Sequence, residues 1–166
     1  GFGCRVLAHD VVENIHVREL GDTYVSMNEL LSVSDILTTL HAPLTPATHH
    51  AIIDSAIVRM KQGVMFINTS RGALIDTSDA IDGLKAGKIG YLGLDVYEQE
   101  EKLFFNDLSE NIIQDDIIMR LMSFPNVLVT AHQGFFTEEA LSQIAQVTLT
   151  NIDAFVAGAT LENRVV

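Results

Sequence analysis

Side chains that can bind anions and move protons follow three apolar runs of this sequence. Arg71 follows one run, Asp95 and Glu100 lie at the end of another, and His132 follows a third. Arginine offers a planar fork that binds a carboxylate at two points, and histidine exchanges protons near neutral pH. A carboxylate beside the histidine favours its charged, proton-donating form. Each residue alone could be a solvated loop position, but the three placements together favour a shared catalytic site.

The elements that must position these residues are predicted to be alternating strands and helices. Short apolar runs alternate with amphipathic stretches, which is typical of βαβ units and a parallel sheet. Expected strands cover residues 6–9, 24–25, 36–40, 64–68, 91–96 and 127–130. Expected helices cover residues 27–32, 55–60, 78–86, 117–122 and 138–156. The fold class is therefore α/β, and open sheets of this class place their chemistry at the carboxyl ends of the strands.

The last helix is the clearest element of the sequence. Thr137 can cap its first amides, and Glu138 and Glu139 face its positive end. Apolar residues recur along it at helical spacing, so this face is expected to be core rather than a surface for a partner.

Asp10 is a candidate ligand of a dinucleotide ribose, because it closes an expected strand. The two valines after it carry no positive charge, which favours NAD over NADP. The alternative is an ordinary turn former or cap. Gly1-Phe2-Gly3 begins a G-x-G pattern, but Val6 stands where the third glycine belongs and a strand follows instead of a helix. The first strand and the phosphate loop of such a fold are therefore expected upstream of residue 1.

Other segments give weaker signals. The loop at residues 41–46 contains two prolines and lies at the cofactor edge, although a rigid turn is the simpler explanation. His49 and His50 are expected to point in different directions, so no metal site is predicted. The acidic stretch at residues 98–116 is expected to be a surface loop, or a segment anchored to a cleft through Phe104-Phe105.

Composition limits the function classes further. The 166 residues are 48% apolar and 19% charged, which indicates a globular chain. A formal net charge of -12 disfavours nucleic acid as a partner. The single cysteine, Cys4, is expected to be buried and fits a reducing compartment. No apolar run approaches the ~20 residues that cross a bilayer, so a cytoplasmic protein without membrane contact is expected.

Several segments, taken together, resemble the D-isomer-specific 2-hydroxyacid dehydrogenases. The most specific is Asn68-Thr69-Ser70-Arg71-Gly72-Ala73, and the resemblance extends over residues 41–45, 64–76, 93–98 and 125–132. Within the family, the chain is closest to the fermentative D-lactate dehydrogenases, on the basis of Tyr97, the insertion at residues 103–116 and the segment at residues 132–136.

The resemblance implies a catalytic group of Arg71, Glu100 and His132. Arg71 would bind the substrate carboxylate, and His132 would protonate the carbonyl oxygen as hydride arrives, with Glu100 as its partner. The intervals of 29 residues (100 minus 71) and 61 residues (132 minus 71) match this branch of the family. Glu98 is the competing assignment for the partner carboxylate.

The resemblance also implies an NAD site and a small 2-keto or 2-hydroxy acid substrate. Asp10 would bind the ribose and Asp95 would lie near the nicotinamide carboxamide. Pro43, Thr69 and Gly134 would line the cofactor. The full-length family member is expected to be a homo-oligomer.

The chain departs from the family in what it leaves out. It is expected to be a partial, Rossmann-like NAD-binding domain over residues 1–166 that lacks the first βα unit with its glycine loop and the substrate domain. The C-terminal helix, about residues 137–157, packs back in the full-length family fold. The missing strand would leave two inner sheet edges unpaired. We therefore expect the isolated chain to bind NAD weakly and to be inactive, so micromolar NADH binding by this chain would contradict the expectation. The alternatives are a dehydrogenase for another D-2-hydroxy acid and a non-catalytic remnant or interaction module.

Overall fold

The structure is a computed structural model that describes residues 3–38, 41–104, 111–161 and 163–164. The chain divides into two compact units, the first ending at Ala131 and the second beginning at His132. Each unit is described by itself. The first holds the sheets, and the second holds the long helix α7, Glu138–Val156.

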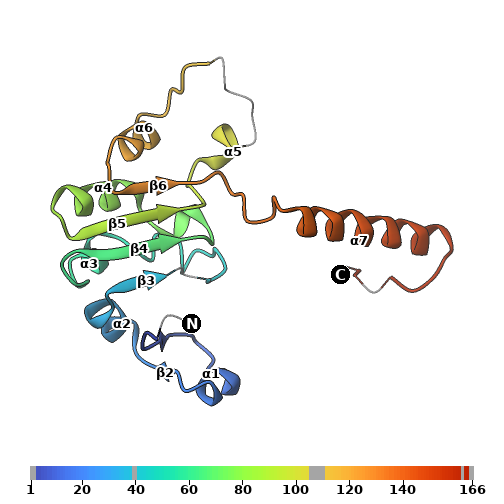
Figure 1. Ribbon diagram of the computed structural model, residues 1–166, viewed down its shortest axis with the longest axis horizontal. Coiled ribbons are helices and arrows are strands. Elements are labelled where there is room, and N and C mark those ends of the chain that lie inside the picture. Colours follow the sequence, from blue (N-terminus) through green and yellow to red (C-terminus); the bar gives the residue numbers. More distant parts are fainter. Residues whose placement is uncertain (1–2, 39–40, 105–110, 162, 165–166) are drawn as a thin grey trace. The chain divides into compact units, whose positions relative to one another are not determined.

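Four parallel strands form the main sheet of the first unit, in the order β3, β4, β5, β6 (Figure 1). Their bounds are Ile36–Thr38, Val64–Asn68, Ile89–Leu94 and Val127–Val129. The strands β1, Leu7–Ala8, and β2, Thr23–Tyr24, form a separate parallel pair. Among the described residues no pairing joins β1 to β3, so the sheet is in two pieces, as expected for a missing inner strand. The α/β class with parallel strands is confirmed.

Helices cover one face of the main sheet and bury its alternate side chains. Val64, Phe66 and Asn68 of β4 are all buried on this face, and Leu92 of β5 lies beside Phe66. The helices of the first unit are α1 Ile15–Glu19, α2 Met27–Val33, α3 Asp54–Ile57, α4 Thr77–Lys85, α5 Glu100–Leu103 and α6 Asp116–Met122. The core joins buried side chains of α2, α3, α4 and α6 to this face of the sheet.

The opposite face of the main sheet is exposed and apolar. Ile36, Tyr91 and Leu128 are 50%, 58% and 66% exposed. The strand register places these three side chains on the same face, because Ile36 pairs with Met65, Met65 with Tyr91, and Gly93 with Leu128. Parallel sheets are normally covered on both faces, so this face is a surface that other polypeptide would bury.

Local capping explains where several helices begin. Ser26 accepts a hydrogen bond from the Glu29 amide, and Asp115 accepts two from the first turn of α6. Thr137 accepts the Ala140 amide at the start of α7, which confirms the predicted cap. The bounds of α7 agree with those expected from the sequence.

Two expectations about elements and burial were wrong. The helices α1 and α5 were not predicted, and both are very short. Cys4 is exposed. Within the second unit, taken by itself, none of the residues of α7 is buried. The helix α5 lies in the expected loop at residues 98–116; Phe104 is packed against the core, and Phe105 lies outside the described residues. Along the part of the chain described, no helix combines the length and apolar character needed to cross a membrane.

Candidate active site

The parallel strands deliver several predicted site residues to one edge of the main sheet. The strands β4 and β5 end at Asn68 and Leu94, so Thr69, Arg71 and Asp95 all follow carboxyl ends. The Asp95 amide donates to the Asn68 carbonyl over 3.0 Å, which holds the two strand ends side by side. The expected gathering of these residues at the carboxyl edge is therefore observed within the first unit.

Asn68 shapes the turn that carries Arg71. Its side chain is only 1% exposed, so both polar atoms need partners. Nδ2 donates to the Arg71 carbonyl over 2.9 Å, and Oδ1 accepts the Ser70 amide over 3.1 Å. The turn is thus built on a buried amide at the end of β4. Asn68 had no predicted role, although a polar residue at the end of a buried apolar strand was a usable signal.

Arg71 lies in an open groove with a volume of about 550 Å³ that also contains Pro43. The groove is lined by His41, Ala42, Pro43, Leu44, Ser70 and Arg71. Arg71 is exposed, and Nη1 donates to the Ser70 carbonyl over 2.8 Å. Among the described residues, no carboxylate forms an ion pair with Arg71, despite the net charge of -12. Its charge is therefore available to an anion in the groove.

The loop beyond Pro43 is held by one hydroxyl group. Thr48 Oγ1 donates to the Pro43 carbonyl over 2.6 Å and accepts the Thr45 amide over 2.8 Å. This fixes the proline wall of the groove that faces the Arg71 turn. The wall is rigid for that reason as well as for its prolines.

Glu100 lies in the same unit, at the start of α5. Its Oε2 accepts the Tyr97 amide over 3.0 Å. Tyr97 is 3% exposed, and its hydroxyl donates to Asp115 Oδ2 over 2.8 Å, while Asp115 Oδ1 caps α6. Burial, together with the hydrogen bond to Asp115, raises the pKa of the Tyr97 hydroxyl. The hydrogen bond between Tyr97 and Asp115 therefore joins the two ends of the segment at residues 97–115, which contains Glu100.

The Tyr97→Phe variant is expected to lose less stability at alkaline pH than the parent protein does. The unfolded tyrosine loses its proton near pH ~10, whereas the folded one keeps it to higher pH. The stability from this hydroxyl is therefore fully present below that pH and is lost as pH rises toward the raised pKa. The Tyr97→Phe variant should be less stable at neutral pH by about 0.5–1.5 kcal/mol, with a flatter alkaline decline.

Urea unfolding at a series of pH values from neutral to strongly alkaline measures this effect. Tyr91→Phe is the matched control, because Tyr91 is 58% exposed on β5. Parallel alkaline declines for the parent protein and Tyr97→Phe would contradict the assignment.

The competing residue, Glu98, is engaged elsewhere in the structure. Its Oε1 lies 2.6 Å from His50 Nε2, and its Oε2 accepts hydrogen bonds from both the amide and the hydroxyl of Thr77. Both carboxylate oxygens are thus committed to neighbours in the fold. Glu100 also has a partner in the fold, the Tyr97 amide, so the choice of Glu100 over Glu98 as the partner of His132 stays a prediction.

The sequence predicts that the side chains of His49 and His50 point in different directions, and this prediction is wrong. Their ring centroids are 3.9 Å apart, with 31° between the ring planes. The reason is the backbone of His50, whose φ of 51° is neither helical nor extended. No group of side chains suited to a metal ion occurs within the described ranges.

His132 and Gly134 belong to the second unit and are described only there. His132 is half-buried and has a φ of 52°, a backbone conformation that is uncommon for residues other than glycine. Strained backbone of this kind is enriched at functional sites. Gly134 is exposed in the turn that precedes α7. The structure therefore brings Thr69, Arg71 and Asp95 to one edge of the sheet in the first unit, and His132 begins the second unit.

Asp10 lies in the chain just after β1 and is exposed. Its Oδ1 accepts the Val11 amide over 2.6 Å and the Val12 amide over 3.4 Å; the second bond forms an Asx-type turn, which is the alternative that the sequence left open. Val11 and Val12 are exposed, and neither side chain carries a positive charge beside the Asp10 carboxylate. A carboxylate followed by two uncharged side chains favours an unphosphorylated ribose over a phosphorylated one.

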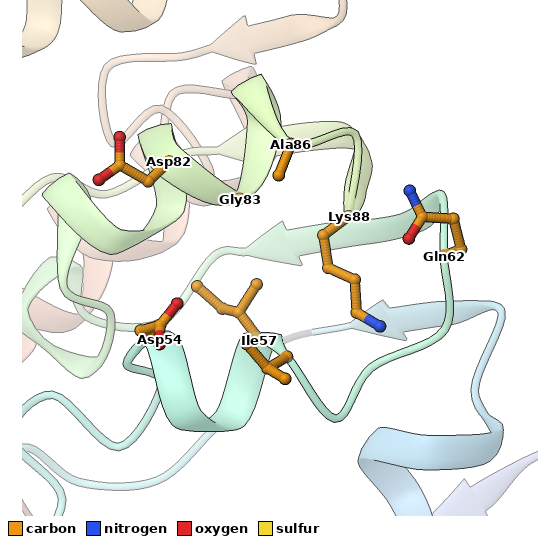
Figure 2. Close-up of a pocket in the computed structure, with 8 residues that line it drawn as sticks. Asp54, Ile57, Gln62, Asp82, Gly83, Ala86 and Lys88 are labelled. Atoms are coloured by element: carbon orange, nitrogen blue, oxygen red, sulfur yellow. The ribbon is translucent and has the colours of Figure 1, made fainter.

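A second hollow, with a volume of about 330 Å³, lies away from this edge. It is lined by Asp54 and Ile57 of α3, by Asp82, Gly83 and Ala86 of α4 and its end, and by Gln62 and Lys88 (Figure 2). Gln62 and Lys88 precede β4 and β5, so this hollow is at the amino ends of the strands. Chemistry in open α/β sheets occurs at the other edge, which separates it from the candidate site.

Comparison with known proteins decides the family. The family "D-isomer specific 2-hydroxyacid dehydrogenase, NAD binding domain" matches residues 1–134 of the chain. The chain belongs to the D-isomer-specific 2-hydroxyacid dehydrogenases. The resemblance seen in the sequence is confirmed, and the matched region contains Arg71, Glu100, His132 and all five predicted cofactor residues.

Individual members of this dehydrogenase family resemble the whole chain. The D-lactate dehydrogenase of Escherichia coli is 50% identical over 166 residues, which are 100% of this chain and 50% of that protein. The pyruvate reductase of Chlamydomonas reinhardtii has a TM-score of 0.91 at 47% identity, covering 97% of this chain and 49% of that one. The D-lactate dehydrogenase of Aquifex aeolicus, solved with NAD and lactic acid, has a TM-score of 0.85 at 40% identity, covering 95% and 47%. The chain spans about half the length of these 2-hydroxyacid dehydrogenases.

Proposed function

We propose that the protein carrying this chain is an NAD-dependent dehydrogenase that interconverts pyruvate and D-lactate. The observation that carries the proposal is Arg71, a guanidinium without an ion pair among the described residues, in a groove at the carboxyl edge of a sheet from this family. A 2-keto acid presents a carboxylate to such a group. The D-lactate dehydrogenase of Escherichia coli, at 50% identity, supports lactate as the product.

Each of the three catalytic residues has a distinct task in this proposal. Arg71 binds the substrate carboxylate and orients the carbonyl. His132 holds a proton that it delivers to the carbonyl oxygen during reduction and takes back during oxidation. Glu100, whose carboxylate accepts the Tyr97 amide, is the proposed hydrogen-bond partner of His132.

NAD would be held by residues that fit it. Asp10 would accept hydrogen bonds from the ribose, and the two valines that follow it carry no positive charge to attract a phosphate. Asp95 would lie near the nicotinamide carboxamide, and Pro43, Thr69 and Gly134 would line the cofactor. The bound coenzyme supplies the hydride of the reaction.

Activity measurements test this function. Purified full-length protein should oxidise NADH in the presence of pyruvate, and chiral chromatography should identify the product as D-lactate. Phenylpyruvate and hydroxypyruvate, assayed in parallel, separate a lactate enzyme from one that acts on a bulkier or more polar acid. The absence of NADH oxidation with all three acids would overturn the proposal.

We infer the wider setting from the same family membership and from composition. The chain forms part of an NAD-binding domain, and α7 packs back in the complete protein. We place that protein in the cytoplasm as a homo-oligomer, acting on a small acid without nucleic acid or membrane as a partner. Light scattering on the full-length protein measures the assembly state, and a monomer would contradict this inference.

A further inference from the structure

His50 lies where three segments near the candidate site meet. The first contact is between backbones: the His50 amide donates to the Ala73 carbonyl over 2.8 Å, and Ile52 forms a parallel bridge with Ile75. The segment at residues 50–52 therefore runs beside residues 73–76. The latter segment begins two residues after Arg71.

The His50 ring connects this pair of segments to two carboxylates. Nε2 lies 2.6 Å from Glu98 Oε1, and Nδ1 lies 3.4 Å from Asp76 Oδ2. The three side chains are between 23% and 30% exposed, so water screens these contacts only in part. A singly protonated ring can donate to one carboxylate and a doubly protonated ring to both.

The carboxylates of Asp76 and Glu98 also accept hydrogen bonds from backbone amides. Asp76 caps α4 through the Ser78 and Asp79 amides, at 3.0 and 3.1 Å. Glu98 accepts the Thr77 amide over 3.0 Å and lies two residues before Glu100. One imidazole thus links the segment after Arg71 to the segment before Glu100.

The backbone of His50 is adapted to this position. Its φ of 51° lies in the left-handed region, which histidine and asparagine enter more readily than most residues. The contacts of its ring with Glu98 and Asp76 hold the residue in this conformation.

We propose that His50 is a positioning residue, which fixes the Arg71 turn relative to Glu100 through its bridge between Asp76 and Glu98. This rests on the proposed dehydrogenase function. His50 itself does not touch the groove that Arg71 lines. Its effect on catalysis acts through the two segments that it joins.

The test compares His50→Asn with His49→Asn in full-length protein. Asparagine tolerates the left-handed backbone but removes the imidazole bridge, and His49 offers the same substitution one residue away on an exposed side chain. We expect His50→Asn to lower kcat/KM for the 2-keto acid by about 10- to 100-fold, because small displacements of catalytic groups have effects of this size. The dissociation constant of NADH and the values for His49→Asn should stay within about twofold.

A second variant and a second measurement distinguish a loss of positioning from a general loss of folding. Glu98→Gln keeps the size of the side chain and an acceptor for Thr77, and its effect should be strongly non-additive with that of His50→Asn. Hydrogen exchange of the Thr77 amide should accelerate in His50→Asn and not in His49→Asn. A lower melting temperature with unchanged kcat/KM per folded molecule would show a purely structural role and overturn the inference.

The outcome separates this inference from the proposed function. An inactive parent protein would overturn the function, and the Thr77 exchange rate would then still decide whether the bridge orders the edge. An active parent protein with equal kinetics for the two asparagine variants would overturn only the role of His50.

Discussion

Arg71→Lys should lower kcat/KM for pyruvate by about 10- to 150-fold, since the loss of one charge-assisted hydrogen bond costs about 1.5–3 kcal/mol. Lysine keeps the positive charge but cannot form the two-point contact of a guanidinium with a carboxylate. The loss should appear in both KM and kcat, because the same contact binds the acid and orients its carbonyl. Steady-state kinetics of the full-length protein measure both quantities.

Arg59→Lys is the matched control for this substitution. Arg59 is also exposed, and its guanidinium donates to the Ser55 carbonyl and to Asn28 on the surface of the first unit. Its replacement should leave the kinetics unchanged. Unchanged kinetics in Arg71→Lys would remove Arg71 from the substrate site.

Gly72→Ala should destabilise the protein by about 1–3 kcal/mol, as overpacking of a rigid contact does. A Cβ atom at Gly72 would overlap with the carbonyl carbon of Tyr97 and the amide nitrogen of Glu98. Both are backbone atoms, so no side-chain rotation relieves the overlap. The displaced backbone carries Arg71 on one side and Glu100 on the other, so activity should fall as well.

Gly93→Ala is the control for the glycine substitution. A Cβ at Gly93 on β5 would lie 3.6 Å from Ile67 Cγ1, which is an ordinary contact distance. The midpoint of urea unfolding and kcat/KM should both be close to the parent values in this variant. Equal effects of the two substitutions would show that the contact at Gly72 is not the cause.

Elements with strong local signals were predictable from the sequence, and elements made by tertiary contacts were not. The helix α7 begins where Thr137, two acidic residues and an apolar period predict it. The helix α5 has four residues, and its first residue is held by the Tyr97 amide, which no periodicity reveals. Periodicity identifies the apolar face of α7 but not the part of the protein that covers this face.

The same distinction applies to the site. The placement of Arg71 and Asp95 followed from strand ends in a parallel sheet, which the apolar runs predict. The cluster of His50, Asp76 and Glu98 could not be predicted, because it depends on a left-handed backbone at a histidine between elements. The family resemblance identified Glu100, whereas the contacts of Glu98 with His50 and Thr77 depend on the tertiary fold and could not be predicted.

The contact between Gly72 and the backbone of residues 97–98 also limits how this edge can be redesigned. A loop transplanted from another dehydrogenase to alter substrate preference would have to fit a neighbour that offers no space for adjustment. Residues 69–77 and 95–100 should therefore be exchanged together, as one cassette. Position 50 belongs in the same exchange, because its side chain contacts both segments.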